Sequence, residues 1–251
     1  MATQVKQADK QETRKTTRLE VLIDESGSME PRAQGVIDGY NEFMDAMKAE
    51  TGELLVSLSM FDSRQGPWVR RRFEDVPIED VKPLRYMSDY QPHGGTPLND
   101  ALFETLEALG SRVREDENAI VVVMTDGQEN QSKNHSSDDV KAIISARENE
   151  GWAFIYLGAN HDVWAQSGGL GYSHHTAKRF SGTVAGTQSS MRAAAVMTNS
   201  YRAGGQSAYE AQSLATPDSI PDDFDPTNVL AEQKGSDEVT EAVEQARKAA
   251  K

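Results

Sequence analysis

Apolar residues follow two alternating patterns along this chain. Strand-length segments dominated by apolar residues occupy residues 19–23, 118–126 and 152–157. In residues 36–47 and 98–109, apolar side chains instead recur every three or four positions, the spacing of one buried helix face. Continuous apolar strands are typical of parallel strands that are covered on both faces. The alternation predicts an α/β protein with a doubly wound, Rossmann-like and mostly parallel sheet, with helices on both faces.

A second pair of strands is predicted between the first two helical segments. Residues 53–62 form one strand, and residues 68–76 form the next, separated by a short turn. Because this connection is too short for a crossover helix, the second strand of the pair should run antiparallel to the first. It carries three consecutive arginines at positions 70–72, which suit an exposed edge strand where charge discourages strand addition. A phosphate site is the less favoured interpretation of these arginines.

Composition divides the chain into three parts. Residues 1–17 are rich in Lys, Gln, Thr and Arg without an apolar period, which predicts a flexible arm. Residues 18–203 carry the strand and helix pattern and form the predicted domain. In residues 204–251, aspartates and prolines first alternate as in a linker. Residues 237–251 then have helical propensity with acids first and bases last, which predicts a marginal helix or, alternatively, a solvated tail.

The overall composition excludes several classes of function. The chain of 251 residues has no cysteine, so it forms no disulfide and no thiolate metal site. It has no apolar run of the roughly 18 residues that a membrane span needs, and its N-terminus lacks the apolar core of a signal peptide. A net charge of −14 argues against nucleic acid or an anionic membrane as partner. The expected location is the cytoplasm.

The candidate chemistry begins at the turn that follows the first strand. Asp24, Ser26 and Ser28 stand at alternate positions there, directly before a helical segment. Ligands of open α/β sheets bind at the carboxyl ends of the strands, and hard oxygen donors suit a cation such as Mg²⁺. The alternative is an ordinary helix N-cap, for which Ser and Asp are favoured residues.

Two later turns strengthen the cation hypothesis. Thr96 lies in a Gly-Gly-Thr-Pro loop, where it is also a plausible helix cap, and Asp126 ends the long apolar strand. Right-handed crossovers bring the carboxyl ends of parallel strands to one edge of the sheet. If the first and the long strand are neighbours, two carboxylates and three hydroxyls converge on one cation.

In these three elements, the chain resembles von Willebrand factor A-type domains, and the five residues resemble their metal-ion-dependent adhesion site. The resemblance covers about residues 18–202, and the DESGSM, GGTPL and TDG strings are most similar to the intracellular branch of bacteria and phages. It implies Mg²⁺ or Mn²⁺ held by Ser26, Ser28 and Thr96, with Asp24 and Asp126 acting directly or through water. An open coordination position would accept an Asp or Glu of a partner protein.

The same resemblance bears on partners and on the residues around the site. It implies a protein partner, such as an AAA+ ATPase of the MoxR or chelatase type, and a host-cytoplasm or virion location if the protein is phage-encoded. Glu25, Asn99 and Asp100 are candidates for aiming the ligands, with ordinary capping as the alternative for the last two.

Two other functions remain open at this stage. One is a structural or assembly protein, possibly phage-borne, in which the metal only stabilises the fold. The other is a metal-dependent hydrolase. The chain has no G-x-S-x-G elbow, phosphate loop or dinucleotide fingerprint at the first strand turn, and its histidines lack zinc-site spacing. His93 deserves notice because its loop should border the metal face. A non-enzymatic binding module is therefore the leading hypothesis.

Overall fold

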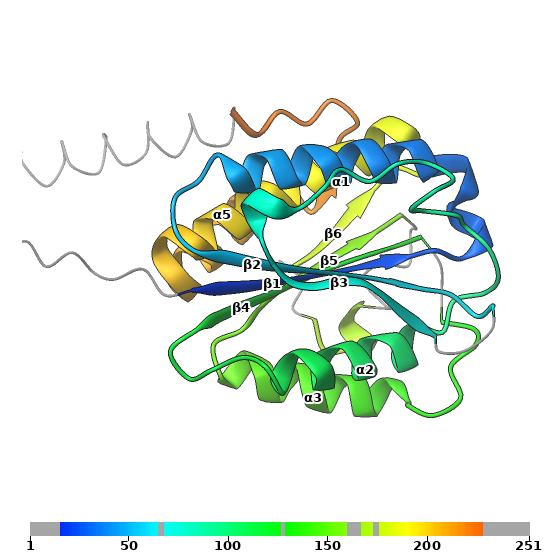
Figure 1. The fold of residues 1–251 in the computed structure, drawn as a ribbon, viewed down its shortest axis with the longest axis horizontal. Helices are drawn as coiled ribbons and strands as arrows, with labels where there is room; N and C mark the ends of the chain where they lie inside the picture. The colour runs from blue at the N-terminus through cyan, green and yellow to red at the C-terminus, as the bar shows by residue number, and fades with distance from the viewer. Residues whose placement is uncertain (1–15, 65–67, 127–128, 160–166, 173–175, 228–251) are drawn as a thin grey trace, which may run out of the picture.

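The protein folds around one seven-stranded sheet with the strand order β3-β2-β1-β4-β5-β6-β7 (Figure 1). The computed structural model describes residues 16–64, 68–126, 129–159, 167–172 and 176–227. The strands are β1 (Thr17–Asp24), β2 (Leu54–Phe61), β3 (Val69–Pro77), β4 (Asn118–Thr125), β5 (Ala153–Gly158), β6 (Ala177–Phe180) and β7 (Ser219–Ile220). All neighbouring strands are parallel except the pair β2 and β3. The predicted doubly wound sheet with one antiparallel edge strand is thus confirmed.

Helices cover both faces of the sheet. One face packs against α1 (Ala33–Lys48) and α5 (Val184–Ala215), and the other against α2 (Leu98–Gly110) and α3 (Ser137–Asn149) (Figure 1). Two short 3-10 helices, η1 (Gly27–Arg32) and η2 (Ile78–Asp80), complete the described elements. Each face has its own apolar core, and the strands between them are buried on both sides.

The central strand β1 lies between β2 and β4, and this arrangement positions the candidate site. Asp24 pairs in register with Phe61 of β2, and Ile23 pairs with Met124 of β4. The condition on which the convergence of the two aspartates depended, that the first and the long strand are neighbours, is therefore met. The carboxyl ends of β1 and β4, and the turns that follow them, meet at the same edge of the sheet.

The predicted domain boundary between residues 203 and 204 does not mark the end of the packed structure. The helix α5 continues past this point with a kink at Gly205, whose φ is +68°. Tyr209, Ile220 and Phe224 beyond the boundary are buried in the core. The change of composition after residue 203 suggested a boundary, but the conformation of Gly205 lets the chain bend and resume the helix.

The remaining parts of the predicted division lie mostly outside the described residues. This holds for residues 1–15 of the predicted arm and for the predicted marginal helix at 237–251. Over the described part of the chain, no helix is both long and apolar enough to span a membrane. The cytoplasmic location stays a prediction.

Candidate cation site

Asp24 is the last residue of β1, and its carboxylate is fixed at both oxygens. Oδ1 accepts a hydrogen bond from the Ser26 backbone N–H at 2.7 Å, and Oδ2 accepts one from Thr125 Oγ1 at 2.6 Å. Thr125 ends β4, so the second bond ties the two strand ends together. Burial raises the pKa of Asp24 to about 6, although the bonds from Thr125 and Ser26 oppose this shift. A nearby cation would stabilise this buried charge.

Ser26 and Ser28 continue the chain of contacts from Asp24 to Asp126. The two serine Oγ atoms lie 3.1 Å apart, and Ser28 Oγ donates a hydrogen bond of 2.7 Å to Asp126 Oδ1. Ser26 stands at the N-cap position of η1, yet its side chain makes no capping hydrogen bond to the helix. The capping interpretation of this serine is therefore wrong, because its hydroxyl faces Ser28 instead.

The predicted threonine lies in a loop that is bound to the same turn. Gly27 N donates to Gly94 O at 3.0 Å, and His93 N donates to Glu25 O at 2.7 Å. Thr96 is buried and does not cap α2, whose N-cap is Pro97. The structure thus links four predicted residues by hydrogen bonds, namely Asp24, Ser26, Ser28 and Asp126, and holds the Thr96 loop against their turn.

Asn130 is a positioning residue that sequence reasoning missed. Its Oδ1 accepts a hydrogen bond of 3.0 Å from Thr96 N, and its own N–H donates to Thr96 O at 3.1 Å. The loop that carries Asn130 is held to the start of α2 by Asp100. The buried Asp100 carboxylate accepts backbone N–H bonds from Lys133 at 2.8 Å and His135 at 2.8 Å. The only sequence feature that could have indicated this positioning role is the run of polar residues after the long strand.

Asn99 and Glu25, the other two predicted supporting residues, also have defined contacts. Asn99 N donates to Glu129 Oε2 at 2.8 Å, which ties α2 to the same loop that Asp100 holds. Glu25 is only 5% exposed at its side chain and pairs with Arg64 at 3.2 Å and with Arg70. Glu25 thus ties the turn to Arg64 and Arg70, whereas Asn99 braces the loop that carries Asn130.

Arg32 brings a positive charge to the predicted site. It ends η1, and its Nη1 forms an ion pair with Asp126 Oδ2 and lies 3.4 Å from Ser28 O. The Arg32 side chain is 13% exposed and that of Asp126 is 3% exposed. Burial lowers the pKa of Arg32, but the group remains charged at neutral pH. The sequence feature that could have indicated this ion pair is the position of Arg32, one helical turn after Ser28.

The residues present fit a hard divalent cation. In the described part of the chain, no group of three or more His, Asp or Glu side chains could hold a metal ion by itself. A cation at this edge would therefore depend on the serine and threonine hydroxyls as well as on the two aspartates. All five side chains offer hard oxygen atoms, the ligands that Mg²⁺ and Mn²⁺ prefer.

The fold and the position of the site at the carboxyl edge define a Rossmann-like α/β domain. Within this class, residues 19–128 match the family model of the von Willebrand factor type A domain. All five predicted residues lie in the matched range. A comparison with the sequences of curated proteins gave no match. Over this range the chain is therefore similar to von Willebrand factor type A domains.

Solved structures with the same fold come from several sources. Proximal thread matrix protein 1 from the mussel byssus has a TM-score of 0.52 at 17% identity, over 72% of this chain and 48% of that chain. The pilus adhesin SpaC from Lactobacillus rhamnosus GG has a TM-score of 0.53 at 14% identity, over 72% and 30%. A von Willebrand factor type A structure from Catenulispora acidiphila has a TM-score of 0.51 at 14% identity, over 72% and 42%. This chain spans less than half the length of each, and the likeness concerns the fold.

Proposed function

We propose that this domain binds a divalent cation, Mg²⁺ or Mn²⁺, and through it an acidic side chain of a partner protein. The observation that carries the proposal is the hydrogen-bonded series from Asp24 through Ser26 and Ser28 to Asp126. It gathers hard oxygen donors from two strand ends at the edge where ligands of such sheets bind. The buried Thr96 loop, packed on the same turn, supplies the fifth donor.

The roles of the residues follow from their charge and position. Ser26, Ser28 and Thr96 would contribute neutral oxygens, so a bound cation would keep enough positive charge to attract a further carboxylate. Asp24 and Asp126 would hold the cation directly or through water, and Thr125 orients the Asp24 carboxylate. The cation supplies an exchangeable position, since Mg²⁺ usually keeps waters that a ligand can displace.

The same contacts favour binding over catalysis. In the described structure, the hydroxyl of Ser26 faces that of Ser28, which donates to Asp126. A nucleophilic serine needs a base within hydrogen-bond reach, usually a histidine. Among the described contacts, neither serine hydroxyl bonds to a histidine, and His93 contacts this turn through its backbone N–H, which donates to Glu25 O. We therefore assign the domain a non-enzymatic role, in which an AAA+ ATPase of the MoxR or chelatase type is a candidate partner by family resemblance.

The test is isothermal titration of Mg²⁺ and Mn²⁺ into metal-stripped protein. The wild type should bind one ion, and the Ser26→Ala/Ser28→Ala double variant should not. A matched control is Ser111→Ala/Ser207→Ala, which removes two exposed hydroxyls elsewhere and should bind as the wild type does. Absence of binding in the wild type, or equal binding in the site variant, would contradict the proposal. Chelation should then abolish partner capture without unfolding the domain.

A further inference from the structure

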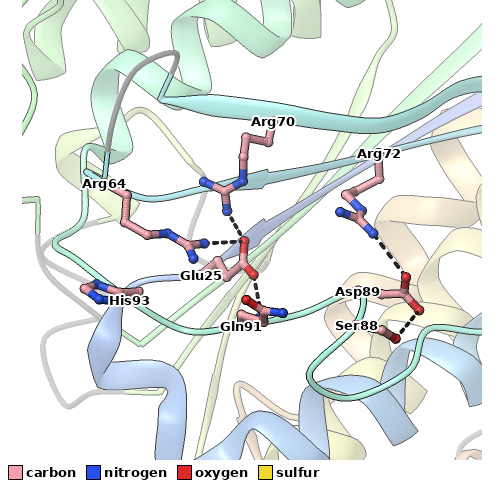
Figure 2. Close-up of a pocket in the computed structure, with 8 residues that line it drawn as sticks. All are labelled: Glu25, Arg64, Arg70, Arg72, Ser88, Asp89, Gln91 and His93. Atoms are coloured by element: carbon pink, nitrogen blue, oxygen red, sulfur yellow. Dashed lines mark hydrogen bonds and ion pairs between the residues drawn. The ribbon is translucent and has the colours of Figure 1, made fainter.

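A hollow of about 730 Å³ opens beside the candidate cation site, between β3 and the loop of residues 88–93 (Figure 2). Its size is within the range of roughly 300–1,000 Å³ that is typical of ligand pockets. Three arginines line it, Arg64, Arg70 and Arg72, and we call it the arginine hollow. Glu25 also lines it, and this residue lies between Asp24 and Ser26 in the sequence. The arginine hollow and the candidate site therefore share one turn.

Buried carboxylates form ion pairs with two of these arginines, Arg64 and Arg70. Asp62 lies 2.6 Å from both Arg64 Nη2 and Arg70 Nη1, and Glu25 pairs with the same two arginines (Figure 2 shows the Glu25 pairs). The carboxylates of Asp62 and Glu25 are 1% and 5% exposed, whereas Arg64 and Arg70 are 30% and 31% exposed. The buried acids thus fix the guanidinium groups while leaving part of them open to solvent. Such fixed groups lose little conformational entropy when a ligand binds.

The ion pair between Arg72 and Asp89 shows that the arginine hollow can hold a carboxylate. Its Nη2 pairs with Asp89 Oδ1 at 3.1 Å, and Arg72 is 37% exposed (Figure 2). Asp89 also accepts bonds from Arg85 N at 2.9 Å and from Arg85 Nε at 3.2 Å. It also accepts a bond from Ser88 Oγ at 3.3 Å, so Asp89 would keep three donor contacts if Arg72 turned to another carboxylate. If a partner's carboxylate replaced Asp89 on Arg72, no buried charge would be left unpaired.

We propose that the arginine hollow binds a second carboxylate of the partner, in an acidic peptide segment whose first carboxylate reaches the cation. The fork of an arginine guanidinium matches a carboxylate with two parallel hydrogen bonds. Glu25 and Asp89 at the wall would repel a doubly charged phosphate more strongly than a singly charged carboxylate. This proposal rests on the proposed function, because the arginine hollow and the cation site share the turn that carries Glu25.

The test measures binding of a fluorescein-labelled hexaglutamate peptide to the full chain by fluorescence anisotropy. Hexaglutamine is the matched peptide, and each titration is run with Mg²⁺ and again with EDTA. Arg72→Gln should weaken hexaglutamate binding by about fivefold or more in both conditions, as the loss of one charged pair at a binding surface predicts. Arg85→Gln is the matched control, since it also removes a partner of Asp89 but lies outside the hollow. Arg72→Lys should recover part of the affinity.

The outcomes separate the subsite from the cation proposal. Binding that needs Mg²⁺ but responds equally to Arg72→Gln and Arg85→Gln would overturn the arginine hollow and leave the cation role standing. Equal wild-type affinity for hexaglutamate with Mg²⁺ and with EDTA, together with weakening by Arg72→Gln but not by Arg85→Gln, would support the hollow and count against the cation role. Failure of the wild type to bind hexaglutamate, or stronger competition by inorganic phosphate than by acetate, would overturn the assignment to acidic peptides.

Discussion

Arg32 and Asp126 form an ion pair at the edge of the sheet where the predicted cation would bind. Both side chains are largely buried, so water screens the pair only partly. A divalent cation beside Asp126 would face the positive charge of Arg32, and two cations compete for one carboxylate. The affinity for the metal must therefore include the free energy of displacing Arg32 from Asp126.

Replacing Arg32 by glutamine should raise the affinity for Mg²⁺ by about tenfold, because roughly 1.4 kcal/mol of competing attraction would be removed. The metal-free variant should melt at a lower temperature than the wild type, since Asp126 loses its positive partner. Addition of Mg²⁺ should then raise the melting temperature of the variant by more than that of the wild type.

Titration calorimetry and thermal melts check this prediction. Arg192→Gln serves as the control, because Arg192 pairs with Glu42 at 2.8 Å between α5 and α1. An unchanged or weaker Mg²⁺ affinity in the Arg32 variant would show that the ion pair does not compete with the metal.

A glycine next to Thr96 provides a second prediction. A Cβ atom on Gly95 would lie 2.6 Å from Gln131 Cγ and 2.9 Å from Asn130 Oδ1, closer than atoms can pack. Asn130 Oδ1 is the atom that accepts the bond from Thr96 N. Gly95→Ala should therefore displace Asn130 and lower the Mg²⁺ affinity by roughly tenfold or more, as changes around metal ligands often do.

This loss of affinity should come with little loss of helix content in circular dichroism. Gly168→Ala is a suitable control, because a Cβ there meets no atom within 4 Å. If Gly95→Ala bound Mg²⁺ as well as the wild type, the Thr96 loop would not position the metal ligands.

The sequence was sufficient to predict the sheet and the turns that carry the candidate site residues. Apolar runs and right-handed crossovers place both strand ends at one edge but leave open whether the two strands are neighbours; the structure pairs β1 with β4, and this brings Asp24 near Asp126. The contact of Arg32 with Asp126 could not be predicted, because it depends on the tight 3-10 turn of η1, which sequence patterns do not specify.

The arginines of β3 show a different limit. The sequence predicted an exposed edge strand, and β3 is indeed at the edge of the sheet. Its arginines also neutralise buried acids, however: Arg70 pairs with Glu25, and Arg71 pairs at 2.6 Å with the fully buried Glu20. Which face each arginine takes depends on the register shifts between β2 and β3, and a single sequence does not reveal these irregularities.

A third prediction concerns stability at the opposite end of the sheet, where Arg18 is the second residue of β1. Its Nε and Nη2 donate to Glu117 Oε2 at 2.6 Å and to Oε1 at 3.1 Å, and the Glu117 side chain is 1% exposed. The hydrogen bonds from Arg18 lower the pKa of Glu117 from 4.5 to about 2. Because this carboxylate is stabilised in the folded state, it contributes stability above the pKa of the unfolded chain.

Glu117→Gln should therefore lower the free energy of unfolding at pH 7 by about 2–3 kcal/mol, and this difference should shrink as the pH falls from about 4.5 towards 2. Urea denaturation at pH 7 and at pH 3.5 measures both values. Glu115→Gln, at an exposed position nearby, should change stability little at either pH. Mg²⁺ affinity should stay as in the wild type, because Arg18 and Asp24 lie at opposite ends of β1. A difference between Glu117→Gln and wild type that did not depend on pH would mean that packing, and not the ion pair, stabilises this end of the sheet.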